Sequence, residues 1–297
     1  MKILIIGSKG FIGSHCIKYF GVEHHQVFGA DIIPDKQKNY TFLEKDNTNF
    51  EQLFIKNKYD VCINASGSAN VAFSFQNPYT DFNLNVANVS KILDAIYKYN
   101  KECKFINFSS AAVYGNPQYL PIDENHPLKP ISPYGLHKLQ SEKLLYEYSK
   151  FFGLKTISLR VFSAFGEGLK KQLFWDLYQK SLNKHDIDLF GTGKETRDFI
   201  YIKDLVRAIE IIINKADFTG EAVNIANGFE YSIKEVVKSF FELFNPEIKI
   251  NFTGKNKKGD PINWKSDISK LKALAYKPKY TINDGLKNYV KWLKELK

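Results

Sequence analysis

The amino-acid sequence predicts an α/β fold, with a doubly wound parallel sheet followed by a smaller, mainly helical second domain. Three observations indicate it. Short apolar runs rich in β-branched residues alternate with longer segments of helical periodicity up to about residue 163. A glycine-rich turn joins the first apolar run to the first helical segment. Beyond residue 163 the alternation weakens and helical segments dominate. Strands that alternate with helices in this way form parallel sheets covered on both faces.

The elements of the first domain follow one another along residues 1–163. Apolar, β-rich runs predict strands at residues 2–7, 25–31, 59–66, 104–110 and 154–162. Apolar residues at helical spacing predict helices at residues 11–21, 83–100 and 134–150. We also expect parts of residues 196–226 to return to this domain.

The second domain is expected from residues 164–195 and 227–297, and the later segments are mostly helical. Helical spacing predicts helices at residues 170–184, 203–214, 232–244 and 284–296. Only short runs, "IDLFG" (187–191) and "AVNIA" (222–226), have strand character. The sequence has no internal repeat and no low-complexity linker, so the boundary between the domains rests on the change of pattern.

Size and composition indicate a folded protein of the cytoplasm. The chain has 297 residues, of which 44% are hydrophobic, enough for one large or two modest domains. No apolar run has the length of a signal-peptide core or of a membrane span. Cys16, Cys62 and Cys103 are isolated from one another, which suggests buried thiols in a reducing compartment. We therefore expect neither a disulfide framework nor a metal site.

The formal net charge of +10 leaves two kinds of partner open. Lysines are spread widely, with one cluster at residues 254–260, so most are expected on a solvated face. Charge alone would permit a nucleic-acid partner. However, the sequence has no helix-turn-helix, zinc-finger or RNA-binding signature. A phosphorylated small substrate suits a basic protein equally well, and we expect neither nucleic acid nor a membrane as a partner.

Three glycines lie between the first predicted strand and the first predicted helix. Gly7, Gly10 and Gly13 allow a tight turn and let backbone amides and a helix N-terminus approach a pyrophosphate. Their place in the first βαβ unit is the context that a dinucleotide site requires. The second predicted strand ends at Asp31, whose carboxylate can accept hydrogen bonds from both ribose hydroxyls of adenosine. Asp31 would repel a 2′-phosphate and so favours NAD over NADP; the alternative is a turn residue at a strand end.

A tyrosine and a lysine lie four residues apart at the start of a predicted helix. Ser132 can cap this helix, and Pro133 suits its first turn. Tyr134 and Lys138 are then i and i+4 neighbours, whose side chains rise from one face and can share a ligand. The alternative is that both side chains decorate the surface of an amphipathic helix, because short motifs often occur by chance.

Four motifs occur in order along the chain. They are the glycine pattern G-x-x-G-x-x-G, "SSAAVYG" (109–115), "YGLHK" (134–138) and "RDFIYIKDL" (197–205). Over nearly the whole chain they resemble the extended short-chain dehydrogenase/reductase family of nucleotide-sugar epimerases, dehydratases and reductases. The resemblance implies a Rossmann-type NAD-binding domain and a second domain that binds a nucleotide-diphosphate sugar. It also implies a homodimer that packs through the helices at 83–100 and 134–150.

The same resemblance implies roles for three side chains. Tyr134 would be the acid/base that exchanges a proton with a sugar hydroxyl as hydride moves to or from nicotinamide. Lys138 would lower the pKa of Tyr134 and bind the nicotinamide ribose, and Ser110 would hydrogen-bond the reacting oxygen. A free tyrosine has a pKa of ~10, so bringing it towards 7 requires ~4 kcal/mol of differential stabilisation of the phenolate. A nearby ammonium and the positive nicotinamide ring are the natural sources of it.

Further positions of the cofactor site carry over from the family with the same resemblance. Phe11 and Ile12 match its pyrophosphate turn, and Asn85 matches an asparagine near a strand end beside the cofactor. Asp46 and Asn47 match an adenine contact, and Ala65 and Ser66 match that strand end. The cofactor residues that we expect are Gly7, Gly10, Phe11, Ile12, Gly13, Asp31, Asp46, Asn47, Ala65, Ser66, Asn85, Tyr134 and Lys138.

On the substrate side the resemblance implies two main contacts. Arg197 matches an arginine that grips the substrate diphosphate, a role suited to a bidentate guanidinium. Asp260 matches a polar contact to the nucleotide ribose. For each position carried over in this way, a turn residue or a surface polar group is the alternative. The substrate residues that we expect are Ser110, Ser163, Lys171, Arg197, Lys257 and Asp260.

Several positions depart from the patterns of the family. Ala111 and Ala112 stand where its 4,6-dehydratases have an Asp-Glu pair, which argues against dehydration. Ser163 replaces a usual asparagine, and Lys257 replaces a second diphosphate arginine, although a lysine can still meet a phosphate as a point charge. These departures leave the sugar open. Residues Lys170, Lys171 and Gln172 lie where relatives bind the nucleotide and are a hypothetical compensation.

The sequence therefore predicts NAD-dependent redox chemistry at ring position 4 of a nucleotide-diphosphate sugar, most simply a 4-epimerase. The alternative is an NAD(P)H-dependent reductase of a nucleotide-4-keto-sugar, in which reduced cofactor is consumed. A more remote alternative is a dinucleotide-binding regulator without catalysis, because a fold alone does not determine function. Such a regulator has little need of the serine, tyrosine and lysine together.

Overall fold

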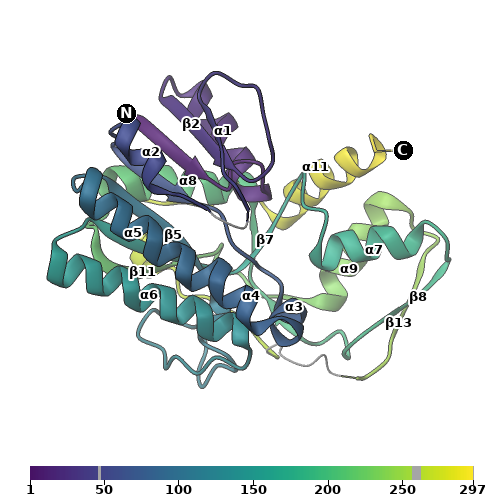
Figure 1. The fold of residues 1–297 in the computed structure, drawn as a ribbon. Helices are drawn as coiled ribbons and strands as arrows, with labels where there is room; N and C mark the ends of the chain where they lie inside the picture. Colours follow the sequence, from purple (N-terminus) through teal and green to yellow (C-terminus); the bar gives the residue numbers. More distant parts are fainter. Residues whose placement is uncertain (46–47, 256–261, 297) are drawn as a thin grey trace.

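The structure is a computed structural model that describes residues 1–45, 48–255 and 262–296. Its centre is a seven-stranded parallel sheet with the strand order β11-β6-β5-β4-β1-β2-β3 (Figure 1). These strands are β1 (Lys2–Ile6), β2 (Gln26–Asp31), β3 (Tyr40–Phe42), β4 (Val61–Asn64), β5 (Lys104–Ser110), β6 (Thr156–Val161) and β11 (Thr219–Ile225). The predicted α/β fold with a doubly wound parallel sheet is confirmed.

Helices of very different length connect these strands. The α-helices are α1 (Phe11–Val22), α2 (Glu51–Lys56), α3 (Val71–Gln76), α4 (Pro78–Phe82), α5 (Asn88–Tyr99), α6 (Pro133–Phe152), α7 (Gln172–Ser181), α8 (Ile202–Lys215), α9 (Ile233–Phe244), α10 (Ser269–Ala273) and α11 (Ile282–Lys294). A π-helical turn, η1 (Asn83–Ala87), and a 3-10 turn, η2 (Ala111–Val113), complete the set.

The two faces of the sheet bury alternate residues of the same strands. In β1, Ile3 and Ile5 belong to the core that includes side chains of α1 and α8. Leu4 and Ile6 belong to a second core with side chains of α2 and α5. Successive side chains of a strand point to opposite faces, so this run of apolar residues requires helices on both sides. α5 packs beside α6 and α1 beside α8 (Figure 1).

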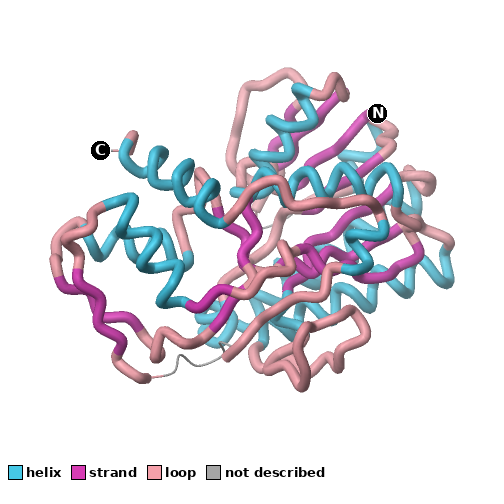
Figure 2. Tube along the Cα trace, turned by 180° about the vertical axis from the view of Figure 1, so that it is seen from behind, coloured by secondary structure: helices cyan, strands magenta, loops and turns pink. Residues whose placement is uncertain are grey.

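Apart from α8 and β11, the chain beyond β6 forms a second layer of helices with three short two-stranded sheets. The pairs are β7 (Ser163–Phe165) with β10 (Phe199–Tyr201), β9 (Thr196–Arg197) with β12 (Tyr231–Ser232), and β8 (Asp186–Leu189) with β13 (Lys249–Phe252). Figure 2 shows β8 and β13 at the outer edge of this part, away from the main sheet. Aromatic rings join its elements: the ring of Phe174 in α7 contacts those of Phe165, Phe199 and Phe240.

Within residues 196–226, the chain returns from this part to the main sheet. α8 packs against α1, and β11 pairs in parallel with β6 at the edge of the sheet. The buried face of α8 carries Leu205, Ala208, Ile209 and Ile212. These residues follow the helical spacing that predicts an amphipathic helix at 203–214.

One predicted helix is wrong at its start. The segment 83–100 is not one α-helix, because its first five residues form the π-helical turn η1 before α5 begins. The wider turn holds the Asn85 side chain in a buried position next to Gly67, where a Cβ atom would lie 2.7 Å from Asn85 Oδ1. The pattern of apolar residues cannot reveal such a turn, because a π-helical hydrogen bond spans only one residue more than an α-helical one.

The three cysteines are buried thiols, as the sequence predicts. Cys16, Cys62 and Cys103 are free and buried. Among the described residues, none of the helices combines the length and the apolar character needed to cross a bilayer.

Candidate active site

The loops after β1, β4 and β5 meet at the carboxyl edge of the main sheet. β1 has β2 on one side and β4 on the other, so the strand order reverses direction at β1. Such a reversal leaves a crevice above the strand ends, and ligands of open α/β sheets bind there. α6 begins beside this crevice, because a Cβ atom at Gly135 would lie 2.5 Å from the carbonyl oxygen of Ala112 in η2.

The turn after β1 has no room for a Cβ atom at Gly7 or Gly13. Gly7 has a φ of 78°, and a Cβ atom there would lie 2.6 Å from the backbone of Ala65. A Cβ atom at Gly13 would lie 2.1 Å from the carbonyl oxygen of Gly7. α1 follows with Gly10 as its N-cap, which offers no side chain to its first amides. These amides are therefore available to an anion, and the turn fits a pyrophosphate.

Asp31 ends β2 next to this turn and is largely buried. Its Oδ2 accepts a hydrogen bond of 2.8 Å from the amide of Lys9, and its Oδ1 accepts one of 3.2 Å from the amide of Ile33. The bond from Ile33 is the contact expected if Asp31 were only a turn residue at the end of the strand. An ionised carboxylate has about four acceptor sites, so these two bonds still leave room for ribose hydroxyls.

A buried amide points to a ligand on the other side of the turn. The side-chain oxygen and nitrogen of Asn85 are both buried and make no hydrogen bond to any described residue. Buried polar atoms nearly always have a partner, so this amide has the chemistry to meet a polar group of a bound molecule. Ala65 and Ser66 follow β4 nearby, where Ser66 Oγ donates a 2.5 Å hydrogen bond to Asn64 Oδ1. The turn and this amide together fit NAD.

α6 begins as its sequence predicts. Ser132 Oγ accepts a 3.1 Å hydrogen bond from the amide of Gly135, and Pro133 occupies the first helical position. Tyr134 and Lys138 are 7% and 6% exposed, and Lys138 Nζ lies 5.8 Å from the centre of the Tyr134 ring. The alternative that the two side chains decorate a surface is therefore wrong.

Ser110, at the end of β5, completes the predicted catalytic set. Burial has the largest effect on the pKa of the Tyr134 phenol and raises it, whereas the neighbouring Ser110 side chain lowers it. Ser110 Oγ accepts a 3.2 Å hydrogen bond from the amide of Ala112 and caps η2. A half-buried serine at a strand end thus lies beside two buried side chains of one helical turn.

Burial has the largest effect on the pKa values of Tyr134 and Lys138. It raises the pKa of Tyr134 to about 12, against the smaller lowering by Ser110. It also lowers the pKa of Lys138 to about 8, and Lys138 Nζ donates a 2.9 Å hydrogen bond to the carbonyl oxygen of Phe108. We expected Lys138 to bring the pKa of Tyr134 down, but the protein alone raises it. A phenolate at neutral pH therefore needs a further positive charge, which the oxidised nicotinamide ring carries.

Two of the predicted substrate residues, Arg197 and Ser163, lie on the short strands β9 and β7. Arg197 Nη1 donates to the carbonyl oxygens of Thr196 (2.8 Å) and Ile262 (3.1 Å), and its guanidinium lies 5.4 Å from the centre of the Trp264 ring. Ser163 begins β7, and its amide donates to the carbonyl oxygen of Asp198.

The two lysines before α7 differ in their surroundings. Burial is the main cause that lowers the pKa of Lys138, and the charge of Lys171 adds to this effect. Lys170 instead lies over the ring of Trp175, and Gln172 begins α7 with a φ of 66°. Four predicted contacts lie outside the described residues: Asp46, Asn47, Lys257 and Asp260.

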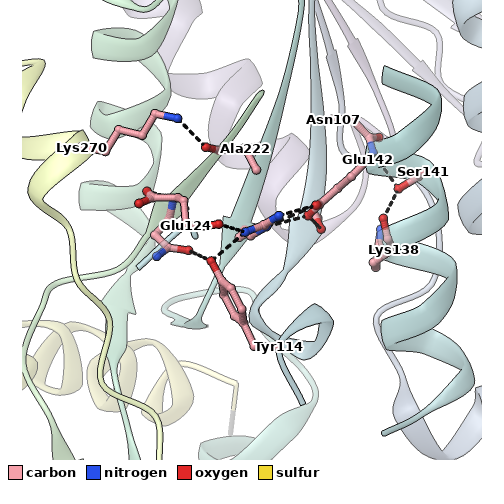
Figure 3. Close-up of polar contacts among 11 residues, drawn as sticks. Asn107, Tyr114, Glu124, Lys138, Ser141, Glu142, Ala222 and Lys270 are labelled. Atoms are coloured by element: carbon pink, nitrogen blue, oxygen red, sulfur yellow. Dashed lines mark hydrogen bonds and ion pairs between the residues drawn. The ribbon is translucent and has the colours of Figure 1, made fainter. Parts of the chain in front are cut away.

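A buried polar network behind the catalytic set was not predicted from the sequence (Figure 3). Glu142 in α6 accepts hydrogen bonds from Arg160 Nη2 (2.7 Å) and Nε (3.0 Å), and from Ser109 Oγ (2.5 Å). Arg160 Nη1 continues to the hydroxyl of Tyr114 at 3.0 Å. Glu142 lies one turn after Lys138 on the same face of α6, and this spacing is the signal that sequence reasoning could have used.

Comparison with known proteins identifies the family. A model of the NAD dependent epimerase/dehydratase family matches residues 3–226. The chain belongs to this family. The predicted resemblance to the extended short-chain dehydrogenase/reductase family, the enzyme class and the use of NAD are thereby confirmed.

Members of the family are similar to this chain over its full length. The uncharacterized UDP-glucose epimerase YtcB of Bacillus subtilis is 31% identical over all of this chain and 99% of its own. The UDP-glucuronate 4-epimerase of Thermodesulfobacterium geofontis is 27% identical over 98% of this chain and 96% of its own. The crystal structure of UDP-glucuronic acid 4-epimerase from Bacillus cereus, in complex with UDP-glucuronic acid and NAD, has a TM-score of 0.90 at 28% identity and covers both chains fully.

Proposed function

We propose that the protein is an NAD-dependent nucleotide-sugar 4-epimerase. The observation that carries this proposal is that the buried side chains of Tyr134 and Lys138 lie beside Ser110 at the end of β5, in a chain whose relatives bear the names of 4-epimerases. A regulator without catalysis would have no use for this arrangement.

The reaction assigns one task to each of the three side chains. The phenolate oxygen of Tyr134 takes the proton of the 4-hydroxyl and returns it after the keto sugar has turned over. Ser110 holds the reacting oxygen by a hydrogen bond, and Lys138 binds the nicotinamide ribose and keeps a positive charge near the phenolate. NAD, when bound, would supply the hydride acceptor and donor that this chemistry at carbon 4 requires. Because the cofactor ends each cycle as it began, no external reductant is consumed.

The substrate side follows from the charges around the crevice. Arg197 grips the diphosphate, with its guanidinium supported by Trp264 and by backbone carbonyls. Ser163, Lys171, Lys257 and Asp260 are the further substrate contacts that we propose. We assign NAD binding to residues 1–163 with α8 and β11, and sugar-nucleotide binding to residues 164–195 and 227–297.

Dehydration has no support in the site. Ala111 and Ala112 form η2 directly after Ser110, where a 4,6-dehydratase needs acidic side chains. An alanine can neither donate nor accept a proton, so elimination of water has no acid there.

We also propose a cytoplasmic homodimer with a role in carbohydrate biosynthesis. Large apolar side chains are exposed along α4, α5 and α6, and a second subunit would bury them. They are Tyr79, Phe82, Tyr97, Leu136, Tyr146, Phe151 and Phe152.

Incubation with UDP-, dTDP-, CDP- and GDP-sugars without added NADH tests the proposal. Turnover of one sugar into its 4-epimer under these conditions is the expected result. A strict stoichiometric need for NADH would instead establish the 4-keto-sugar reductase. Binding of NAD without turnover of any sugar, with or without NADH, would favour the regulator.

A further inference from the structure

A buried hydrogen-bonded pair, His137 and Asp81, lies on the catalytic helix and has no part in the mechanism described above. His137 Nδ1 lies 2.7 Å from Asp81 Oδ2. Asp81 is 0% exposed and His137 is 8% exposed. Buried carboxylates are rare in proteins unless a local function or a partner retains them.

The position of the pair links two segments of the site. His137 directly precedes Lys138 on α6, whereas Asp81 comes from α4. The α3–α4 segment also touches the first turn of α6 through Ser74, whose Oγ accepts a 3.1 Å hydrogen bond from the amide of Tyr134. The ring of Phe82 packs edge-on against that of His137, with centres 5.6 Å apart. The pair is thus a polar contact between α4 and the turn that carries the acid/base.

Only one of the two carboxylate oxygens of Asp81 has a hydrogen-bond partner among the described residues, and the other, Oδ1, is buried. A charge that is poorly screened in a low-dielectric interior acts on its neighbours over several ångströms. Accordingly, Asp81 raises the pKa of both Tyr134 and Lys138: it opposes the phenolate and favours the ammonium.

Other charged groups face the same point from neighbouring elements. Lys171, before α7, lowers the pKa of Lys138, and Glu142, further along α6, raises it. His137, which holds Asp81, lies three residues after Tyr134 on α6, so the two side chains are neighbours on the helix surface. Asp81 is therefore an acidic group close to the phenol, and its charge adds to the larger effect of burial in raising the pKa of Tyr134.

We propose that His137 and Asp81 are positioning residues for the acid/base: they fix the α3–α4 segment on the first turn of α6, and the charge of Asp81 sets how readily Tyr134 releases its proton. The inference rests on the proposed function in that Tyr134 is taken as the acid/base. It concerns the proton affinity of one side chain, which can be measured without any sugar.

The variant Asp81→Asn tests the charge and keeps the shape. The asparagine oxygen can still accept a hydrogen bond from His137 Nδ1, while the negative charge is lost. We expect the Tyr134 phenolate to form at a pH lower by about one unit in the NAD-loaded protein, because a like charge near an acid shifts its pKa by this order. The measurement is the ultraviolet absorbance of the phenolate against pH, taken as the difference from the same protein with Tyr134→Phe.

His137→Gln separates charge from packing. The glutamine amide can donate to Asp81, so the carboxylate keeps its charge and the phenolate should form at the wild-type pH or higher. The matched control is Asp204→Asn in α8, where another fully buried carboxylate pairs with an arginine, Arg207, remote from the site. This control should unfold more easily and leave the phenolate titration unchanged.

If Asp81→Asn folds poorly, the double variant Asp81→Leu with His137→Leu replaces the pair by apolar packing, which proteins often tolerate. In this double variant the Tyr134 phenolate should also form at a pH lower by about one unit. A titration of Asp81→Asn that coincides with wild type would overturn the proposal. So would a downward shift of equal size in His137→Gln, because the charge would then not be its cause. Absence of sugar turnover would overturn the epimerase and leave this result standing.

Discussion

Tyr134 is the side chain on which the proposed chemistry depends. It is buried between Ser110 and Lys138, and its pKa in the protein alone is raised to about 12. The side chain must therefore gain its reactivity from what binds beside it, and its removal should affect the chemical step more than the binding of cofactor.

Tyr134→Phe should lower turnover by about three orders of magnitude, because general acid/base catalysis contributes about that much. The affinity for NAD should remain close to wild type, as the phenyl ring keeps its packing. Sugar turnover and NAD titration measure the two quantities. Tyr148→Phe, on the same helix and remote from Ser110, is the control and should retain full activity. Equal activity of Tyr134→Phe and wild type would exclude Tyr134 as the acid/base.

Lys138 links the site to the stability of the protein. Burial lowers its pKa to about 8, below that of about 10.4 for an unfolded lysine. The unfolded chain therefore binds more protons between these two values, so the stability contribution of Lys138 is lost as the pH falls through 8. Relative to Lys138→Met, the cofactor-free wild type should gain about 3 kcal/mol of unfolding free energy from pH 8 to 10.5. Urea denaturation of both proteins across this range measures it, and parallel curves would contradict it.

The sequence predicts a part of the site, and the reason is local. Tyr134 and Lys138 share one helical turn, and Gly7 and Gly13 share one loop, so spacing alone places them. Asp81 and His137 are 56 residues apart and meet only when α4 packs on α6. No local pattern contains that contact.

At the scale of elements, α6 is the part of the fold that has to be placed accurately. Its middle is tied to the sheet by Glu142, which binds Arg160 of β6 and Ser109 of β5. Both partners of the ion pair are nearly fully buried. A shift of this helix would move Tyr134 and Lys138 together.

Glu142→Gln should therefore cost about 3–5 kcal/mol of unfolding free energy, because it leaves Arg160 buried without a counter-charge. The double variant Glu142→Leu with Arg160→Met should cost less than this single change, since apolar packing replaces both charges. Urea denaturation of the two variants and wild type gives the comparison. A double variant less stable than Glu142→Gln would contradict the prediction.

The elements differ in how far the sequence predicts them. Long amphipathic helices such as α6, α8 and α9 lie within two residues of the predicted ranges, because many periodic positions define them. Strands β7, β9, β10 and β12 have two or three residues each and show no period that a sequence could reveal. They form because residues far apart in the chain come together in the folded protein.

At the scale of the whole molecule, one buried carboxylate holds three parts of the chain together around the substrate side. Asp198, next to Arg197, accepts hydrogen bonds from the amides of Asn227 (2.9 Å), Gly228 (2.9 Å) and Ser266 (3.3 Å). An asparagine there would direct its amide hydrogens at one or more of these donors.

Asp198→Asn should lower the unfolding free energy by about 2 kcal/mol, because buried donors lose their acceptor. It should also raise the KM for the nucleotide sugar while the affinity for NAD is kept, since the glycine turn lies on another part of the chain. Denaturation, steady-state kinetics and NAD titration measure the three effects. An unchanged KM would show that Asp198 supports the fold without shaping the substrate side.

The exposed apolar side chains of α5 and α6 concern the assembly of the whole protein. Tyr97 of α5 and Phe152 of α6 are both about 40% exposed, and their rings contact each other with centres 5.4 Å apart. A surface of this kind that spans two adjacent helices favours association with a second copy.

Tyr97→Glu with Phe152→Glu should convert a dimer to a monomer, because each interface would then bury four added charges. Sedimentation measures the mass, and Phe190→Glu, an exposed phenylalanine after β8, is the control that should remain dimeric. A wild-type monomer would remove the homodimer, and a dimeric double variant would place the interface on another face.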